Sequence, residues 1–207
     1  VELEPAAALY RISLLRLLVI YRQDALEAEV PSDPQLELQQ QAREHARRVS
    51  ATVHPQDGGG HMILGTAFRS LGDLDRACRH FAMAADVREN RVPAMLELGF
   101  CQQQAGKSGE ARKTLGNLHA EYPDDPEVCN SYGYFLAELG EDLELAEKLV
   151  KQALAVDPVN GAYLDSLGWV YYQMGRYEEA FDYLVEAANA RGEDPVILEH
   201  LGRTLQR

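Results

Sequence analysis

Six histidines and three cysteines are the residues of this 207-residue chain that could bind a metal or transfer protons. Cys78 and His80 lie two positions apart, which places them on different faces of a helix, and no second pair has the spacing of a zinc site. An odd number of cysteines without motif spacing forms no closed disulfide framework, so we expect Cys78, Cys101 and Cys129 to be buried or half-buried thiols. The sequence therefore predicts structural or solvent-facing histidines, no metal and no cofactor.

Other catalytic patterns are equally weak. The stretch "QDGGGH" lacks the lysine and the preceding strand of a phosphate-binding loop. Ser166 has neither a nucleophile-elbow context nor a candidate base nearby in sequence. Paired carboxylates such as Asp124 and Asp125 are expected in solvent-facing turns. We therefore expect no catalytic residues and a protein that is not an enzyme.

The charge balance indicates the kind of partner. With 33 acidic and 20 basic residues the chain has a net charge of -13, which repels phosphate and disfavours nucleic acid. No apolar run approaches the roughly 20 residues needed to span a bilayer. The sequence begins at Val1, so we expect any targeting segment to lie upstream, and cytoplasmic and bacterial envelope locations both stay open.

A repeat of about 34 residues organises the chain from residue 58 onward. Glycines that follow Leu or Tyr recur at spacings of 34, 34, 35 and 34 residues, at Gly65, Gly99, Gly133, Gly168 and Gly202. A second glycine follows seven residues after each of the first four, at Gly72, Gly106, Gly140 and Gly175, where a helix end requires positive φ. Apolar residues then recur at i, i+4 and i+7, as on one face of a second helix. The pattern predicts antiparallel helix pairs.

These residues resemble the tetratricopeptide repeat family, most closely in "GAYLDSLGWVYYQMGRYEEAFDYLVEAANARGED" (residues 161–194). The resemblance implies an all-α fold, a right-handed superhelix or α-solenoid of antiparallel helix hairpins, with a concave groove lined by the first helix of each pair. Stacking is also expected on physical grounds, because a lone hairpin cannot bury its apolar face. We predict repeats at residues 58–91, 92–125, 126–160 and 161–194, and a capping helix at 195–207. The closing repeats resemble those of bacterial adaptor and lipoprotein arrays.

Residues 1–57 fit the repeat less cleanly. Two helices are predicted, at about Pro5–Glu29 and Asp33–Val53, separated by "VPSDP". Ala42, Ala46 and Val49 follow the second-helix pattern, so this N-terminal helical hairpin is either a degenerate repeat or a separate element. The glycines of "DGGG" (residues 57–60) are expected to weaken the next helix start and to act as a hinge.

Each first helix carries two stripes. At 100° per residue, the Leu-Gly glycine shares one face with the residues four before, one before and three after it, and this face is expected to be the core. In the fourth repeat the core face comprises Leu164, Leu167, Gly168 and Tyr171. The second stripe, about 120° away, carries Asp165, Trp169 and Tyr172, and the residue after the glycine is aromatic in three successive repeats, at Phe100, Tyr134 and Trp169.

We expect this second stripe to bind a partner, because an apolar strip with a polar rim is typical of binding sites. The candidate groove residues are Glu97, Phe100, Asn130, Tyr134, Asp165, Trp169, Tyr172, Glu199 and Arg203. Their carboxylates and amides favour a peptide or partner helix with apolar side chains and basic or hydrogen-bond-donor groups. A structural alternative is that the aromatic residues pack between neighbouring first helices.

Two functions from different classes follow. The first is a non-catalytic protein-interaction module, or adaptor, which holds an extended peptide or a partner helix in its groove. The second is a self-assembling scaffold that uses the apolar segment "LYRISLLRLLVIY" (residues 9–21) or an open end of the array. Loss of partner capture in Trp169→Ala with Tyr134→Ala would support the first, and loss of self-association on deletion of the residues before Gly58 would support the second.

Overall fold

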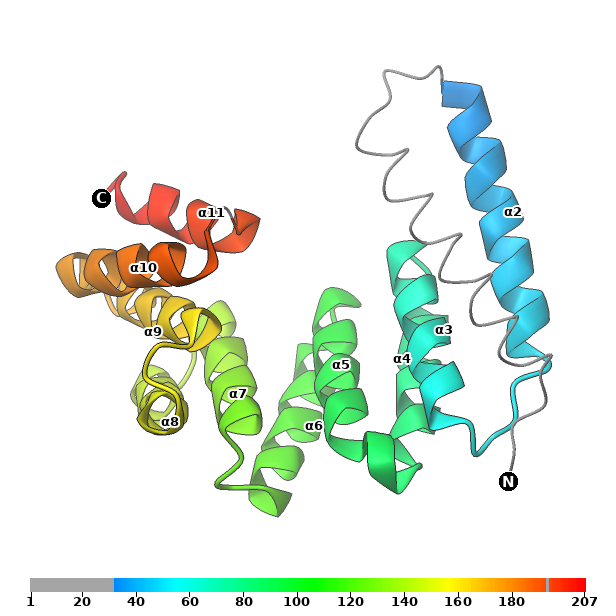
Figure 1. The fold of residues 1–207 in the computed structure, drawn as a ribbon, viewed down its shortest axis with the longest axis horizontal. Helices are drawn as coiled ribbons and strands as arrows, with labels where there is room; N and C mark the ends of the chain where they lie inside the picture. The colour runs from blue at the N-terminus through cyan, green and yellow to red at the C-terminus, as the bar shows by residue number, and fades with distance from the viewer. Residues whose placement is uncertain (1–31, 193) are drawn as a thin grey trace. The chain divides into compact units, whose positions relative to one another are not determined.

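The computed structural model describes residues 32–192 and 194–207. Within these ranges the chain is all-α and forms no strand, which confirms the predicted fold class. The helices are α2 (Ser32–Ser50), α3 (Gly58–Ser70), α4 (Leu74–Ala85), a 3-10 turn η1 (Arg88–Asn90), α5 (Arg91–Gln104), α6 (Ser108–Glu121), α7 (Pro126–Leu139), α8 (Leu143–Val156), α9 (Gly161–Gln173), α10 (Tyr177–Arg191) and α11 (Pro195–Thr204) (Figure 1). The predicted helix Pro5–Glu29 lies outside the described residues.

Short polar side chains begin several of these helices. Asp125 Oδ1 accepts hydrogen bonds from the backbone N–H groups of Glu127 and Val128, and the first residue of α7 is a proline, which has no N–H to satisfy. The "DGGG" stretch behaves in the same way and is not a hinge loop. Asp57 caps α3 through the N–H of Gly60, so the three glycines form the first turn of that helix.

Glycines with positive φ end the first helices, as predicted. Gly72, Gly106, Gly140 and Gly175 have φ between 65° and 77°. The extra residue of the third repeat is absorbed at the same kind of turn, because Asp142 also adopts a left-handed conformation with φ of 46°. Arg112 forms ion pairs with both Glu141 and Asp142, and these contacts help to hold the longer turn.

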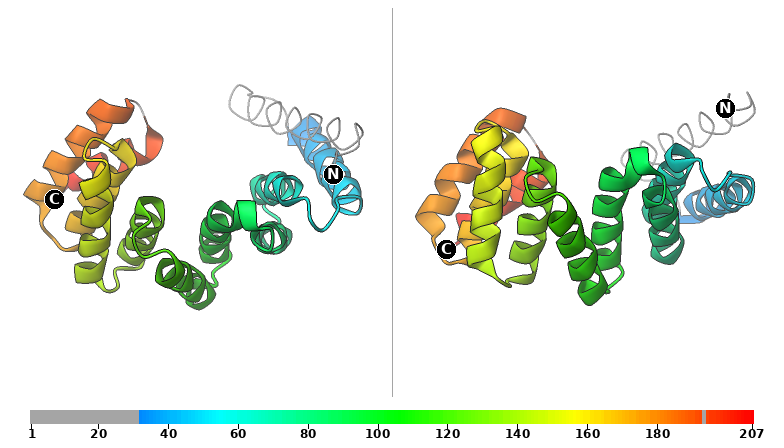
Figure 2. Two further views of the ribbon diagram at one scale, coloured as in Figure 1. Left: turned by 60° about the horizontal axis from the view of Figure 1, so that its bottom comes forward. Right: turned by 90° about the horizontal axis from the view of Figure 1, so that it is seen from below.

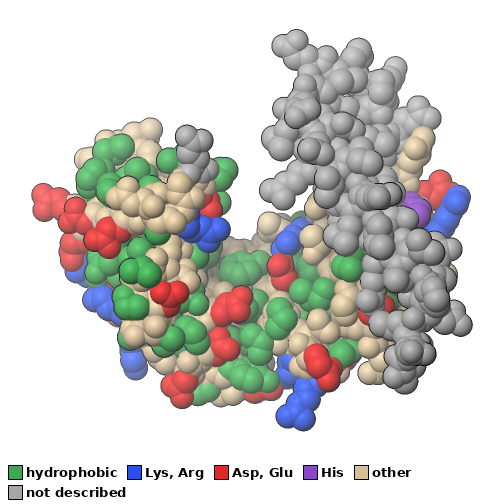
Figure 3. Space-filling model, in the orientation of Figure 1, with side chains coloured by type: hydrophobic (Ala, Val, Ile, Leu, Met, Phe, Trp, Pro, Cys, Tyr) green, Lys and Arg blue, Asp and Glu red, His purple; other side chains and the backbone are tan. Residues whose placement is uncertain are grey.

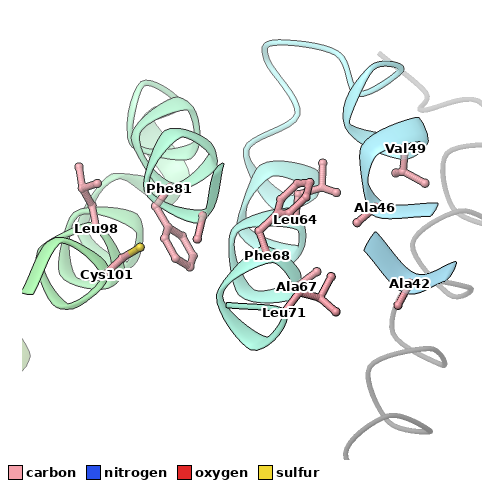
Figure 4. Packing of buried hydrophobic residues seen from close by; sticks show 11 residues of the cluster. Ala42, Ala46, Val49, Leu64, Ala67, Phe68, Leu71, Phe81, Leu98 and Cys101 are labelled. Atoms are coloured by element: carbon pink, nitrogen blue, oxygen red, sulfur yellow. The ribbon is translucent and has the colours of Figure 1, made fainter. Parts of the chain in front are cut away.

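The chain divides into two compact units, residues 1–111 and 112–207, and the boundary falls inside α6. In the first unit a core cluster joins α2, α3, α4 and α5 (Figure 4). Phe68 and Phe81 are fully buried there. On α2, the predicted second-helix residues Ala42, Ala46 and Val49 are buried and belong to the same cluster as α3. These contacts attach α2 to the first unit.

In the second unit the Leu-Gly glycines allow close helix packing. A Cβ at Gly168 would lie 2.6 Å from Leu184 Cγ on α10, and a Cβ at Gly133 would lie 2.7 Å from Val150 on α8. The predicted core face of α9 is buried under α10, with Leu167 only 1% exposed. Figure 2 shows α10 and α11, in orange and red, alongside α9, and Ile197 of α11 shares a buried cluster with Leu164 of α9.

Candidate functional site

The predicted aromatic stripe of the second unit forms a continuous column of rings. We define the aromatic column as five rings on α7, α9, α10 and α11, namely Tyr134, His200, Trp169, Tyr172 and Tyr177. The first helices position all but Tyr177, since Tyr134 lies on α7, Trp169 and Tyr172 on α9, and His200 on α11. Successive centroids are 6.2, 4.1, 4.8 and 5.5 Å apart, and the shortest of these distances joins His200 to Trp169.

Trp169 lies in the middle of this column and is only 3% exposed. The ring planes of Tyr172 and His200 are nearly parallel to the indole, at interplanar angles of 5° and 13°. The guanidinium carbon Cζ of Arg203 lies 5.6 Å from the centroid of the Trp169 ring, within the range of a cation–π interaction. Trp169 therefore packs between neighbouring first helices, which is the structural alternative considered for this residue.

A buried carboxylate holds His200 in place. The Nδ1 atom of His200 lies 2.9 Å from Asp165 Oδ1, and the two residues are 5% and 6% exposed. Because an ionised carboxylate only accepts hydrogen bonds, Nδ1 carries the proton and donates it. This hydrogen bond joins α9 to α11 and sets the imidazole plane against Trp169. Asp165, predicted for the groove, is thus an internal partner of His200.

The predicted contact residues Tyr134, Tyr172 and Asn130 are half-buried, whereas Glu199 and Arg203 are exposed and form an ion pair at 2.6 Å. Burial, together with the nearby carboxylates of Glu138, Asp165 and Glu199, raises the pKa of Tyr134 above its ordinary value. The negative charge of these carboxylates disfavours an ionised, negatively charged Tyr134 side chain. For the same reason it would attract a positively charged ligand group to this surface.

Two polar atoms in this region are buried without a hydrogen-bond partner among the described residues. They are the indole N–H of Trp169, a donor, and Oδ1 of Asn130, an acceptor. Unpaired buried groups are uncommon in proteins and carry a desolvation cost.

The remaining predicted groove residues, Glu97 and Phe100, belong to the first unit. Glu97 is ion-paired with Arg69, so part of the acidic character expected of this face is neutralised. Phe100 is half-buried on α5. The structure therefore brings together the predicted residues of α7, α9 and α11, and describes those of α5 separately.

Sequence reasoning missed the organised histidines. Besides His200, the first unit holds His61 and His80, whose Nδ1 atoms lie 3.0 Å apart, and His80 Nε2 is 2.8 Å from Ser50 Oγ on α2. Burial is the main cause that lowers the pKa of both histidines, that of His80 to about 4. The sequence predicted structural or solvent-facing histidines, but it did not identify these partners. Each of these contacts joins different helices, so spacing along one helix could not reveal it.

No three metal-binding side chains gather anywhere in the part of the chain that the structure describes. Cys101 and Cys129 are buried and Cys78 is half-buried, and all three are free thiols, as predicted. Among the same residues, no helix has the length and apolar character needed to cross a membrane.

Antiparallel helix pairs with a small residue at each close contact place this chain in the class of helical-repeat proteins. Residues 93–125 and residues 161–193 each match a tetratricopeptide repeat family model. The chain therefore carries tetratricopeptide repeats at these two segments, and this repeat family and fold are typical of non-catalytic protein-interaction modules.

Curated relatives match parts of longer proteins. A TPR repeat-containing protein of Pseudomonas aeruginosa is 33% identical over 93 residues, which cover 45% of this chain and 16% of that protein. The type IV pilus assembly protein PilF of the same organism is 28% identical over 49% of this chain and 40% of its own length. The cell division cycle protein 16 homolog of Mus musculus is 22% identical over 79% of this chain and 34% of its length. The chain thus spans well under half of these relatives.

Solved structures share the fold at low sequence identity. The Cut9-Hcn1 hetero-tetramer of the APC/C superposes with a TM-score of 0.65 at 19% identity, covering 93% of this chain and 40% of the other. MamA from Desulfovibrio magneticus superposes with a TM-score of 0.56 at 21% identity, covering 92% and 98%. At these identities the likeness concerns the fold alone.

Proposed function

We propose that this chain is a non-catalytic adaptor that binds a peptide segment or partner helix on the first-helix surface of its second unit. One observation carries the proposal: the aromatic column spans three first helices and remains half-exposed at Tyr134 and Tyr172 while its centre is packed. Rigid, partly exposed aromatic rings with a charged rim are typical of protein-binding surfaces.

The surrounding charge indicates the ligand's chemistry. Residues 112–207 contain 18 acidic and 8 basic residues, a net charge of -10, whereas residues 1–111 carry a net charge of -3. The carboxylates that raise the pKa of Tyr134 lie beside the column. A ligand with apolar side chains and lysine or arginine fits this surface, and an acidic ligand does not.

Trp169 is the chain's only tryptophan and lies inside the column, so its fluorescence reports on this surface. We would titrate the chain with an array of peptides that combine leucine or phenylalanine with lysine. We expect saturable fluorescence changes that weaken at least tenfold in the variant Tyr172→Ser with Glu199→Lys, which removes one half-exposed ring and one exposed carboxylate.

The matched control is Phe181→Ser, because Phe181 is an exposed aromatic residue of α10 outside the column. It should bind with unchanged affinity, and circular dichroism should show equal helicity in all three proteins. Equal binding by the column variant and the control would contradict the proposal.

The self-assembling scaffold stays an alternative, and its apolar segment (residues 9–21) lies outside the described residues. The structure improves the test of this alternative. Deleting everything before Gly58 would strip the buried residues of α2 from the core of the first unit. Deletion of residues 1–31 alone avoids this damage, and light scattering at several concentrations would then measure whether self-association is lost.

A further inference from the structure

Two of the three cysteines lie together in the first unit, although they belong to different helices. Cys101 of α5 is part of the core cluster of this unit, and Cys78 of α4 is one of the half-buried residues packed against that cluster. The Cys101 thiol donates a weak hydrogen bond to the carbonyl oxygen of Leu74, at 3.5 Å. In a helix this carbonyl accepts the backbone N–H of the residue four positions later, which is Cys78. The sulfur of Cys101 therefore lies against the turn of α4 that carries Cys78.

The two thiols are also in contact with each other. Figure 4 shows the sulfur of Cys101 pointing from α5 toward Phe81, which lies on α4. Burial, and then a hydrogen bond with the neighbouring Cys78 thiol, raises the pKa of Cys101 to about 12. Two side chains that point toward each other from adjacent helices meet the first geometric requirement of a disulfide.

The two thiols differ in their access to solvent. Cys101 is completely buried, whereas Cys78 is half-buried. Acidic and basic side chains lie next to each other on the surface of this unit (Figure 3). One such pair joins Lys107 Nζ to Asp75 Oδ1 at 2.8 Å, and Lys107 is close enough to Cys78 for an electrostatic interaction. A small solute can therefore reach the sulfur of Cys78 from this exposed edge, but not the sulfur of Cys101.

We propose that Cys78 and Cys101 are a site of reversible oxidation, at which a hydroperoxide converts the two thiols into a disulfide. The Cys78 thiolate attacks one peroxide oxygen, the O–O bond breaks and hydroxide leaves, which gives a sulfenic acid at Cys78. The Cys101 sulfur then attacks the Cys78 sulfur, the S–O bond breaks, and the departing hydroxide takes the Cys101 proton to leave as water. Overall, two thiols and one hydrogen peroxide give one disulfide and two waters, and the two electrons lost by the sulfurs reduce the peroxide oxygens.

Reduction of the disulfide must begin at the exposed sulfur. A dithiol reductant attacks Cys78, because Cys101 is buried, and a second attack within the reductant releases both protein thiols and oxidises the dithiol. The high pKa of Cys101 keeps it a thiol at neutral pH, so the step that closes the disulfide should be slower than the first attack.

The disulfide would join two predicted repeats, since α4 belongs to residues 58–91 and α5 to residues 92–125. It would fix α5 against α4 and would restrict the unfolded chain between residues 78 and 101. Phe100, one of the predicted groove residues, directly precedes Cys101, so oxidation would also restrain the helix that carries this ring. The site therefore gives the first unit a more rigid oxidised form.

The main test compares the folded chain with the same chain unfolded in urea. The fully reduced chain is equilibrated with mixtures of reduced and oxidised glutathione, and peptide mapping by mass spectrometry measures the fraction of Cys78–Cys101 disulfide. We expect an equilibrium constant at least about tenfold larger in the folded chain, because the fold holds the two thiols together. A smaller ratio would show that the thiols only fill space in the core, and would overturn the proposal.

The second test uses hydrogen peroxide on the reduced, folded chain. The mass should fall by about 2 Da as the Cys78 and Cys101 peptides become linked, while Cys129 stays reduced because it is buried and belongs to the second unit. Hydrogen exchange should slow in α4 and α5, and dithiothreitol should restore the original rates. Oxidation of Cys78 to a sulfinic acid without a link, or a main product that links two chains, would overturn the proposal.

Cysteine variants separate the roles of the two thiols. Cys101→Ala should leave the Cys78 sulfenic acid without a partner, so it should gain about 32 Da as a sulfinic acid. Cys78→Ala should react with peroxide at least about tenfold more slowly at Cys101, because that thiol is buried. The matched control is Cys129→Ala, which also removes a buried thiol and should form the same disulfide at the same rate.

Circular dichroism checks the helicity of the three variants, and the comparison in urea uses the unaltered chain, so it does not depend on their folding. Equal peroxide reactivity of Cys101 with and without Cys78 would contradict the order of the two steps and would overturn the mechanism proposed here. Because these thiols lie in the first unit and the aromatic column lies in the second, failure here leaves the proposed peptide-binding function standing.

Discussion

Each of the two units buries a histidine-centred polar cluster, and the two clusters differ in what the histidine contacts. In the first unit His80 lies between another histidine and Ser50, and burial lowers its pKa to about 4. In the second unit His200 donates a hydrogen bond to the buried carboxylate of Asp165. The first cluster therefore joins its helices through neutral histidines, and protonation at low pH destabilises it. The second cluster contains a buried negative charge on Asp165, which needs the hydrogen bond from His200.

The largest loss of stability should come from removing His200, the hydrogen-bond donor to Asp165. In His200→Leu the carboxylate of Asp165 stays buried without its donor, and we expect a loss of about 3 kcal/mol in the free energy of unfolding. Urea unfolding followed by circular dichroism measures it. The double variant His200→Leu with Asp165→Leu removes both polar groups and should be more stable than His200→Leu alone. If the double variant were the less stable of the two, the second cluster would not depend on a buried charge that needs a partner.

The next largest effect is on the stability of the first unit, which should depend on pH. Because the pKa of His80 is about 4 in the folded protein and about 6.5 in an unfolded chain, the unfolded state binds more protons between these values. The stability is full above pH 6.5 and falls as the pH drops toward 4, by about 2 kcal/mol between pH 7 and pH 5. Hydrogen-exchange protection factors of α3 and α4 at several pH values measure this loss.

The control for the pH effect is His54→Gln, because His54 is exposed, and this variant should keep the full pH dependence. The variant His80→Gln should lose most of it. A pH dependence that survives in His80→Gln would show that another group in the first unit carries it.

A smaller effect is expected for the contact that joins α2 to the first cluster. Ser50→Ala removes the hydroxyl 2.8 Å from His80 Nε2 and should cost about 1 kcal/mol. Hydrogen exchange should accelerate in α2 and leave α9 and α11 unchanged. Thr52→Ala is a suitable control, since the Thr52 hydroxyl donates a hydrogen bond to the nearby Val49 carbonyl. Equal acceleration by both variants would argue against a specific link through His80.

The smallest loss of stability is expected for Arg203, the exposed residue beside Trp169. Arg203→Gln removes the guanidinium whose Cζ lies 5.6 Å from the Trp169 ring centroid, and we expect a loss of about 0.5 kcal/mol because the side chain is 54% exposed. The emission maximum of Trp169 should shift while helicity stays constant. Unchanged fluorescence would mean that Arg203 makes no effective contact with the indole in solution.

Much of the fold could be predicted because local rules determine it. The spacing of Gly65, Gly133 and Gly168 located the close helix contacts, since only a residue without a side chain fits there. The second glycines ended helices at the expected places with positive φ. The stripe on α2 was also recognised, and Ala42, Ala46 and Val49 are buried. These features depend on the periodicity of one helix at a time.

The sequence predicted the candidate site only in part. The helical wheel separated Trp169 from the core face of α9, but it could not tell that α11 covers the indole with His200 and Arg203. In the Trp169–His200 contact, the residue after one repeat's glycine meets the residue two before the next glycine. Such a pairing joins residues 31 positions apart, so it becomes visible only when neighbouring first helices are placed side by side.

By itself, the sequence determined the helix pairs, their turns, the positions that must be small and the acidic charge of the chain, because each follows from local backbone preference or from composition. Only the tertiary structure decided which polar groups meet inside and which aromatic rings remain exposed. Those properties depend on contacts between helices that lie far apart in the sequence, where the burial of a side chain is determined by its neighbour and not by its own position.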